Sequence, residues 1–155
     1  MSYKLDKPYT DEQYADFVVE HNHNNGLTIE ETETALFALE ANEILVDGEV
    51  QIDPDYEQKQ ADKEAERVAK LILTGAVVER GIFKAKKMDF DDIVAFVTAN
   101  PPEGLDVKAL KIELKANHFY RGNPYVDAVG KLLGFTKEQL DKFFETNDYT
   151  YLLSE

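Results

Sequence analysis

Signals that start a helix recur along this chain, and they constrain its fold more than any other feature. A Thr or Asp at the N-cap satisfies a free backbone N–H group, and a Gln or Asp three residues later completes a capping box. Thr10 with Gln13 and Thr136 with Gln139 show this pattern. Further helix starts are expected at Thr28, Asp53, Asp89, Asp106 and Asn123. We therefore expect a mainly α protein, a short helical bundle with one small β-hairpin in the N-terminal half.

Two helices are expected in the first 40 residues. The first begins at Thr10 and ends at Gly26, because Gly readily adopts the left-handed conformation that terminates a helix. The second begins at Thr28, which is followed by glutamates that favour a first turn. Apolar residues at helical spacing define the buried faces. These residues are Tyr14, Phe17 and Val18 in the first helix and Ile29, Leu36 and Leu39 in the second.

In residues 43–52 the spacing of the apolar residues is no longer helical, and this segment predicts a β-hairpin. Asp47 and Gly48 stand between apolar residues of the two arms. An Asp-Gly pair favours a type I′ turn, since both central positions need positive φ. This turn places Leu45 opposite Val50. A two-stranded hairpin is marginal in water, so we expect a cover or a third strand.

Residues 54–67 predict a long polar helix with Asp53 as its N-cap and a Pro at its first position. Only Ala61, Ala65 and Val68 offer a thin apolar stripe. Two interpretations stay open. The one we favour is a solvated connecting helix, and the other is a helix that docks on a partner chain.

The chain divides at this helix into an acidic N-terminal region, residues 1–70, and a C-terminal helical bundle, residues 71–155. About five short helices are expected in the bundle. The helix from Asp106 is expected to reach about Tyr120, and Gly134 separates the last two helices. The apolar residues expected in the core include Phe90, Ile93, Val94, Val97, Leu140, Phe143 and Phe144.

The end of the bundle is an aromatic tail with a different period. Tyr149, Tyr151 and Leu153 alternate, which is the spacing of a strand. We expect the hairpin or a partner chain to hold this tail in place. Its three alternating side chains are therefore candidate docking residues.

Charge is divided unevenly along the chain. Residues 1–60 hold 15 Asp and Glu against 3 Lys, a net charge of −12, and residues 61–155 hold 16 acids against 14 bases, a net charge of −2. This acidity disfavours phosphate backbones and anionic lipids, so we expect no direct nucleic-acid partner and no membrane partner. The helix pair at residues 124–144 has the dimensions of a DNA-reading motif. Because its bases do not exceed its acids, we interpret it as an ordinary helix pair.

Patterns typical of catalysis or metal binding are missing from the sequence. The chain has no Cys and three His. His21 and His23 are two residues apart near the end of a helix, so they point about 200° apart around its axis. A metal site needs three or more converging ligands. No nucleophile or phosphate-loop glycine pattern occurs. We expect no enzymatic activity, no cofactor and no metal.

One row of basic residues is evident in the sequence. Lys108, Lys111 and Lys115 are spaced to share a helix face, and His118 and Arg121 continue the line. We interpret this row as the one basic stripe in the chain. It is either a solvated helix face or a dock for an acidic surface, such as the N-terminal half of another copy. The three lysines and Arg121 are therefore candidate docking residues.

Two stretches resemble a known group of proteins. The first is KPYTDEQYADFVVEHNHNNG, residues 7–26, with its continuation at residues 35–64, and the second is FYRGNPYVDAVGKLLGFTKEQLDKFFE, residues 119–145. Together they resemble small proteins encoded among the late tail and baseplate genes of phages and prophages of Gram-positive bacteria. The resemblance implies a virion component or assembly factor and supplies no catalytic residues.

The expected function is a non-enzymatic phage structural or assembly protein, acting as a tail- or baseplate-associated interaction module. Its expected partners are other phage or prophage proteins, or further copies of itself. The alternative is an acidic inhibitor that mimics DNA toward a host nucleic-acid-binding protein. Residues 1–6 contain no apolar segment of a secretory signal. The expected location is the bacterial host cytoplasm during synthesis, with the virion as a later destination.

Overall fold

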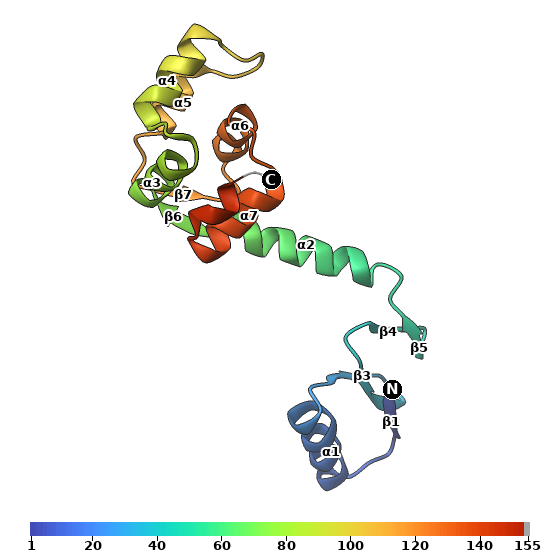
Figure 1. The fold of residues 1–155 in the computed structure, drawn as a ribbon. Helices are drawn as coiled ribbons and strands as arrows, with labels where there is room; N and C mark the ends of the chain where they lie inside the picture. Colours follow the sequence, from blue (N-terminus) through green and yellow to red (C-terminus); the bar gives the residue numbers. More distant parts are fainter. Residues whose placement is uncertain (154–155) are drawn as a thin grey trace. The chain divides into compact units, whose positions relative to one another are not determined.

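The chain is mainly α, with several small antiparallel sheets, which confirms the expected class at this level. The structure is a computed structural model that describes residues 1–153 (Figure 1). Two compact units are present, residues 1–60 and residues 61–155. Their boundary falls inside helix α2 (Tyr56–Ala69), whereas the sequence suggested a division at residue 70.

The first unit combines one helix with a three-stranded sheet and a hairpin. The sheet is antiparallel with the order β1-β3-β2, so its central strand is the last of the three in the chain. The hairpin pairs β4 with β5. The elements are β1 (Tyr3–Asp6), α1 (Asp11–Val18), the π-helical turn η1 (Val19–Asn24), β2 (Thr28–Glu31), β3 (Ala35–Leu39), β4 (Glu43–Val46) and β5 (Glu49–Ile52).

The helix expected from Thr28 is wrong, because this segment forms β2 and β3. All five residues of β3 are buried. Phe37 and its neighbours at alternate positions form a small core with Leu45 and Val50 of the hairpin. A short, continuous apolar run fits a strand covered on both faces, and helical spacing within such a run does not distinguish the two structures.

The hairpin prediction is confirmed. Leu45 lies opposite Val50, and the turn residues Asp47 and Gly48 have φ values of 52° and 80°. The required cover is β3, so the hairpin does not need the C-terminal tail as a third strand. The capping box of Thr10 and Gln13 at the start of α1 is also confirmed.

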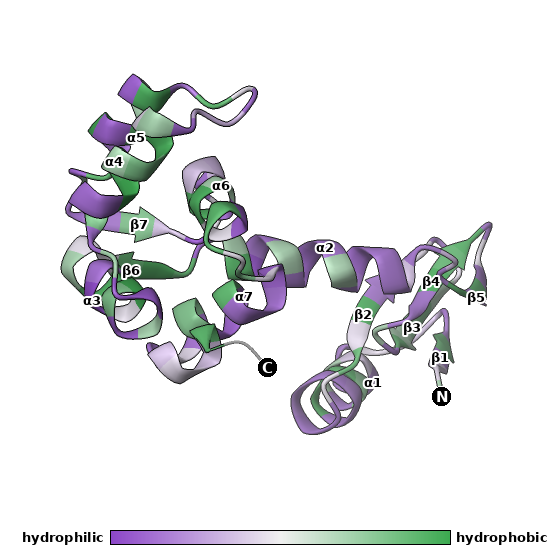
Figure 2. Cartoon of the chain, turned by 45° about the horizontal axis from the view of Figure 1, so that its top comes forward, coloured by the Kyte–Doolittle hydropathy of each residue, from purple (hydrophilic) through white to green (hydrophobic). Residues whose placement is uncertain are grey.

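Helix α2 has no buried residue, and most of it is hydrophilic (Figure 2). Ala61 and Ala65 are exposed and Val68 is half-buried. The helix begins at Tyr56, two residues later than expected. Asp53 is buried and accepts hydrogen bonds from the backbone N–H of Asp55 and from Lys59 Nζ. The exposure of α2 agrees with a solvated helix.

The second unit is a bundle of short helices around one apolar core. The expected helix starts at Asp89, Asp106, Asn123 and Thr136 are confirmed as side-chain caps. Its elements after α2 are β6 (Ile72–Thr74), α3 (Gly75–Lys86), α4 (Phe90–Ala99), α5 (Val107–Glu113), β7 (His118–Tyr120), α6 (Pro124–Leu132), α7 (Lys137–Thr146) and the 3-10 helix η2 (Tyr149–Leu152). Its core includes Val78, Ile82, Ile93, Val97, Leu110, Phe119, Leu140, Phe143, Phe144 and Leu152.

Two parts of this unit correct the sequence analysis. The helix from Asp106 ends at Glu113, and β7 pairs antiparallel with β6, placing Phe119 opposite Leu73. The expected single hairpin is therefore incomplete as a description of the β structure. These strands are three residues long and pair across more than 40 positions, so local spacing does not reveal them.

The aromatic tail is a 3-10 helix and not a strand. Asp148 caps it by accepting hydrogen bonds from the backbone N–H and the hydroxyl group of Thr150. Leu152, which the alternating pattern left out, is 1% exposed in the core. Tyr151 and Leu153 remain 44% and 48% exposed. A turn stabilised by its own cap accounts for the difference from strand spacing.

Candidate functional site

The predicted basic row is not a single helix face, and its last member is buried. Lys108 and Lys111 are exposed on α5, but Lys115 and His118 lie beyond the end of that helix. Arg121 is 6% exposed. The helical spacing of the five residues fails because the chain leaves the helix at Leu114.

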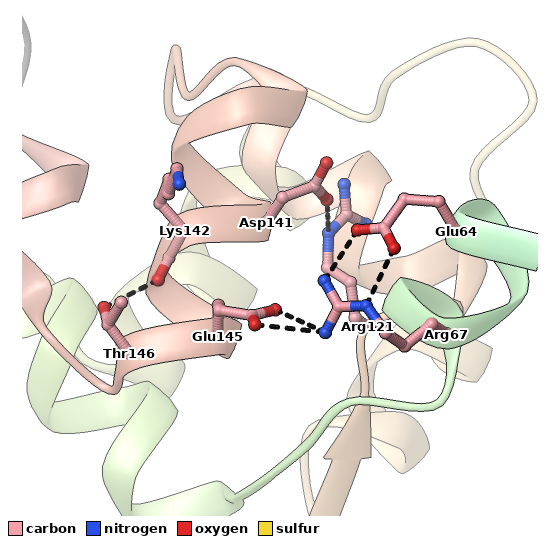
Figure 3. A network of polar contacts seen from close by, with 7 residues as sticks. All are labelled: Glu64, Arg67, Arg121, Asp141, Lys142, Glu145 and Thr146. Carbon is pink, nitrogen blue, oxygen red and sulfur yellow. Dashed lines mark hydrogen bonds and ion pairs between the residues drawn. The ribbon is translucent and has the colours of Figure 1, made fainter. Parts of the chain in front are cut away.

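Arg121 is the buried cation of an ion-pair network and does not belong to a docking surface. Its Nε lies 2.7 Å from Asp141 Oδ1 and its Nη1 lies 2.9 Å from Asp127 Oδ1. Figure 3 shows the Arg121 side chain beside Asp141 of α7. A guanidinium held by two carboxylates is satisfied within the fold, so its role is structural.

A second basic row, which the sequence analysis missed, lies on α3. Arg80 and Lys84 are four residues apart on α3, Lys87 follows as the left-handed C-cap of this helix, and all three side chains are exposed. The one acid of this helix, Glu79, accepts a hydrogen bond from the backbone N–H of Phe90. Helical spacing was sufficient to find this row, so the interpretation of a single basic stripe is wrong.

The α3 row borders a hollow between α3, the end of α7 and η2. The hollow has a volume of about 240 Å³ and is lined by polar and charged atoms from Arg80, Lys84, Asn147 and Tyr149. Its apolar part includes Val77, Gly81 and Phe143. We call this feature the α3 hollow. Of the predicted docking residues, the structure places Tyr149 here, while Tyr151 and Leu153 do not line it.

Close packing of α3 on α7 shapes the α3 hollow. Gly81 is buried, and a Cβ atom built on it would lie 2.5 Å from Cζ of Phe143. Phe143 is itself 2% exposed, so the added atom would meet a buried ring. Gly81 therefore lets the two helices approach, and its bare backbone leaves space beside Arg80 and Lys84.

Two cations line the α3 hollow, and its lining includes no acidic residue among residues 1–153. Lys84 Nζ lies 4.9 Å from the centre of the Tyr149 ring in a cation–π contact, and no carboxylate of the described residues pairs with this ammonium. Arg80 forms no ion pair with residues 1–153. The acid nearest to Tyr149 in the sequence is Asp148. Its carboxylate accepts hydrogen bonds from the hydroxyl group and the backbone N–H of Thr150, and these bonds lower its pKa. Two cations, an amide and a phenol in one hollow form a surface suited to carboxylates.

The first unit carries a surface of opposite charge. Glu12, Asp16 and Glu20 follow one another at four-residue intervals along α1 and η1, and all three are exposed. No hydrogen-bond donor or cation among the described residues contacts their carboxylates. We call these residues the α1 ridge. Residues at this spacing are neighbours on a helix surface, so the ridge concentrates negative charge.

The paired histidines of the first unit are placed differently from each other. His21 is buried, stacked on Tyr3 with ring centres 4.2 Å apart and in edge contact with Phe17 at 4.5 Å, whereas His23 is exposed. Across residues 1–153, no group of three or more His, Asp or Glu side chains is placed to hold a metal ion. The contacts of His21 are those of a core residue.

Comparison of the chain with protein-family models, curated proteins and solved structures gives no match. Within the described residues, no helix combines the length and the apolar character needed to cross a membrane.

Proposed function

We propose that this chain is a non-enzymatic protein–protein interaction module, a structural or assembly component associated with phage tails or baseplates. The observation that carries the proposal is the α3 hollow, in which Arg80 and Lys84 form no ion pair with any carboxylate of residues 1–153, in a chain of net charge −14. An acidic chain has many carboxylates available to neutralise its own cations. Cations left open beside a hollow are therefore suited to binding another protein.

Two further features support a role in assembly. The polar helix α2 joins the two units without burying a side chain, as a connecting element does. The stretches at residues 7–26 and 119–145 resemble proteins encoded among phage tail and baseplate genes. The resemblance supplies the biological setting of the proposal, and the geometry of the α3 hollow supplies the mode of binding.

The α1 ridge favours a second candidate function, an acidic inhibitor of a host nucleic-acid-binding protein. Its three exposed carboxylates repeat about every 6 Å along the helix axis. A regular row of negative charge can occupy a surface that otherwise binds phosphates. In this alternative the α1 ridge binds the partner and the α3 hollow has no part.

Purification of the tagged full-length chain from phage-producing cells distinguishes the two functions. The proposal expects virion proteins to co-purify, and expects their recovery to fall when Arg80 and Lys84 are replaced by Glu. The inhibitor alternative expects a host DNA-binding protein that is released by added double-stranded DNA and lost on replacing Glu12 and Asp16 by Lys. Recovery of such a host DNA-binding protein without any virion protein would overturn the proposal.

A further inference from the structure

We propose that the partner of the α3 hollow is the α1 ridge of a second copy of this chain. The ridge is defined by Glu12, Asp16 and Glu20, and the hollow is bordered by Arg80 and Lys84. This inference rests on the proposed function in that both treat the hollow as a docking surface. It adds the identity of the occupant.

The two surfaces match in spacing. Glu12 and Asp16 are separated by four residues, as are Arg80 and Lys84. Four residues correspond to about 6 Å along a helix axis. Two helices packed side by side can therefore bring two carboxylates opposite two cations in one register. Glu20 extends the ridge by a further four residues, whereas Lys87 is the left-handed C-cap of α3 and lies outside the helix.

The hollow has room for the side chains that would enter it. Its volume is about 240 Å³. A water molecule occupies about 30 Å³ of liquid, so several waters can leave when a carboxylate enters. Lys84 is already positioned over the Tyr149 ring, which reduces the freedom lost when it pairs with a carboxylate.

Charge complementarity selects a second copy as the occupant. Residues 1–60 carry a net charge of −12, and the three carboxylates of the ridge are without a cation among the described residues. Every copy brings one ridge and one hollow. Two copies that exchange both contacts about a two-fold axis close as a dimer, and copies that each use one contact in a head-to-tail arrangement form a ring or a filament.

The test is sedimentation velocity of the full-length chain over a range of concentrations at low and high salt. We expect species larger than a monomer to grow with concentration, and to diminish at high salt, where exposed charges are screened. A variant with Arg80→Glu and Lys84→Glu should weaken association by roughly tenfold or more, since like charges would then face each other. Glu12→Lys with Asp16→Lys should have the same effect.

Mixing the two variants gives the decisive measurement. One variant has an acidic ridge and an acidic hollow, and the other has a basic ridge and a basic hollow, so each repels itself and attracts the other. Association should return in the mixture. The matched control is Lys131→Glu with Lys142→Glu, which makes the same charge change at exposed positions on α6 and α7 and should leave association unchanged. Circular dichroism checks that every variant folds.

Three outcomes would overturn the inference. The first is a wild-type chain that sediments as a monomer at all concentrations at low salt. The second is a mixture of variants that fails to associate, and the third is a control that disrupts association as strongly as the hollow variant. If the chain is monomeric yet recovers virion proteins through Arg80 and Lys84, the proposed function stands and only the identity of the occupant is wrong.

Discussion

The Nε atom of Arg121 lies 2.7 Å from Oδ1 of Asp141, and this bond joins the segment after β7 to α7. Arg121 is buried, while the Asp141 side chain is 41% exposed. The same guanidinium bonds Asp127 of α6, so one side chain holds two helices. The cation is the buried member of the network, and this asymmetry predicts different costs for removing its members.

Replacing Arg121 by Ala should destabilise the second unit by about 2–4 kcal/mol, because two charge-assisted hydrogen bonds and the packing of a long side chain are lost. Asp141→Asn should cost about 1 kcal/mol, because Asp127 still pairs with the guanidinium. Urea unfolding of both variants measures the two values. Equal losses of unfolding free energy in Arg121→Ala and Asp141→Asn would contradict the view that Arg121 is the centre of the network.

Features that depend on neighbouring residues were predictable from the sequence. The capping boxes at Thr10 and Thr136 and the turn at Asp47 and Gly48 are each formed by residues within three positions of one another. Their geometry needs no information about the rest of the chain. The starts of most helices, and the hairpin register, followed from these local rules.

Features that depend on distant residues were missed. Strand β3 is a strand because β1, β2 and the hairpin surround it, and β7 is a strand because β6 lies beside it. The same limit applies to the candidate site. The spacing of Arg80 and Lys84 was visible in the sequence, but their position beside Tyr149 required the packing of η2 on α3.

Gly81→Ala should destabilise the second unit by about 1–3 kcal/mol, the usual cost of overfilling a packed interface. The added methyl group would meet the Phe143 ring, which is buried and closely packed. Thermal unfolding measures the effect. In a double variant with Phe143→Leu, the smaller side chain should remove most of the additional cost of Gly81→Ala. If the free-energy costs of Gly81→Ala and Phe143→Leu simply add in the double variant, the contact between the added methyl group and the Phe143 ring is not the cause of the destabilisation.

The buried carboxylate of Asp53 should make the stability of the first unit depend on acidic pH. The hydrogen bond from Lys59, followed by that from the backbone N–H of Asp55, lowers the pKa of Asp53. A lowered folded-state pKa gives stability that is complete above the unfolded pKa, about 3.9, and is lost as pH falls through the folded pKa. Wild type should therefore lose stability below about pH 4 more steeply than an Asp53→Asn variant.

Denaturant unfolding between pH 7 and pH 3, followed through the NMR signals of β4 and β5, measures this difference. The difference in unfolding free energy between the wild type and Asp53→Asn should be constant above about pH 5 and should narrow below about pH 4. If this difference in unfolding free energy stays constant from pH 7 to pH 3, the ionisation of Asp53 does not contribute to the stability of the first unit.

The second unit should fold without the first, and its stable boundary should be residue 61 and not residue 70. The buried residues of its apolar core run from Val78 to Leu152, and Leu71, Leu73 and Val77 pack against them. The end of α2 nevertheless contacts this unit, because the backbone N–H of Gly122 donates to the Ala69 carbonyl at 3.0 Å. Arg67 Nη1 also lies 3.0 and 2.9 Å from the two carboxylate oxygens of Glu145. Figure 3 shows these two side chains pointing toward each other.

We expect fragments 61–155 and 70–155 both to unfold cooperatively, with the shorter fragment melting at a lower temperature. Loss of the Gly122 hydrogen bond costs about 1 kcal/mol, which corresponds to about 4–8 °C in a domain of this size. Fragment 61–155 with Arg67→Ala is the matched control, since it keeps that hydrogen bond and loses the ion pair with Glu145. This control should melt between the other two. Equal melting temperatures for the two fragments would place the end of α2 outside the cooperative unit.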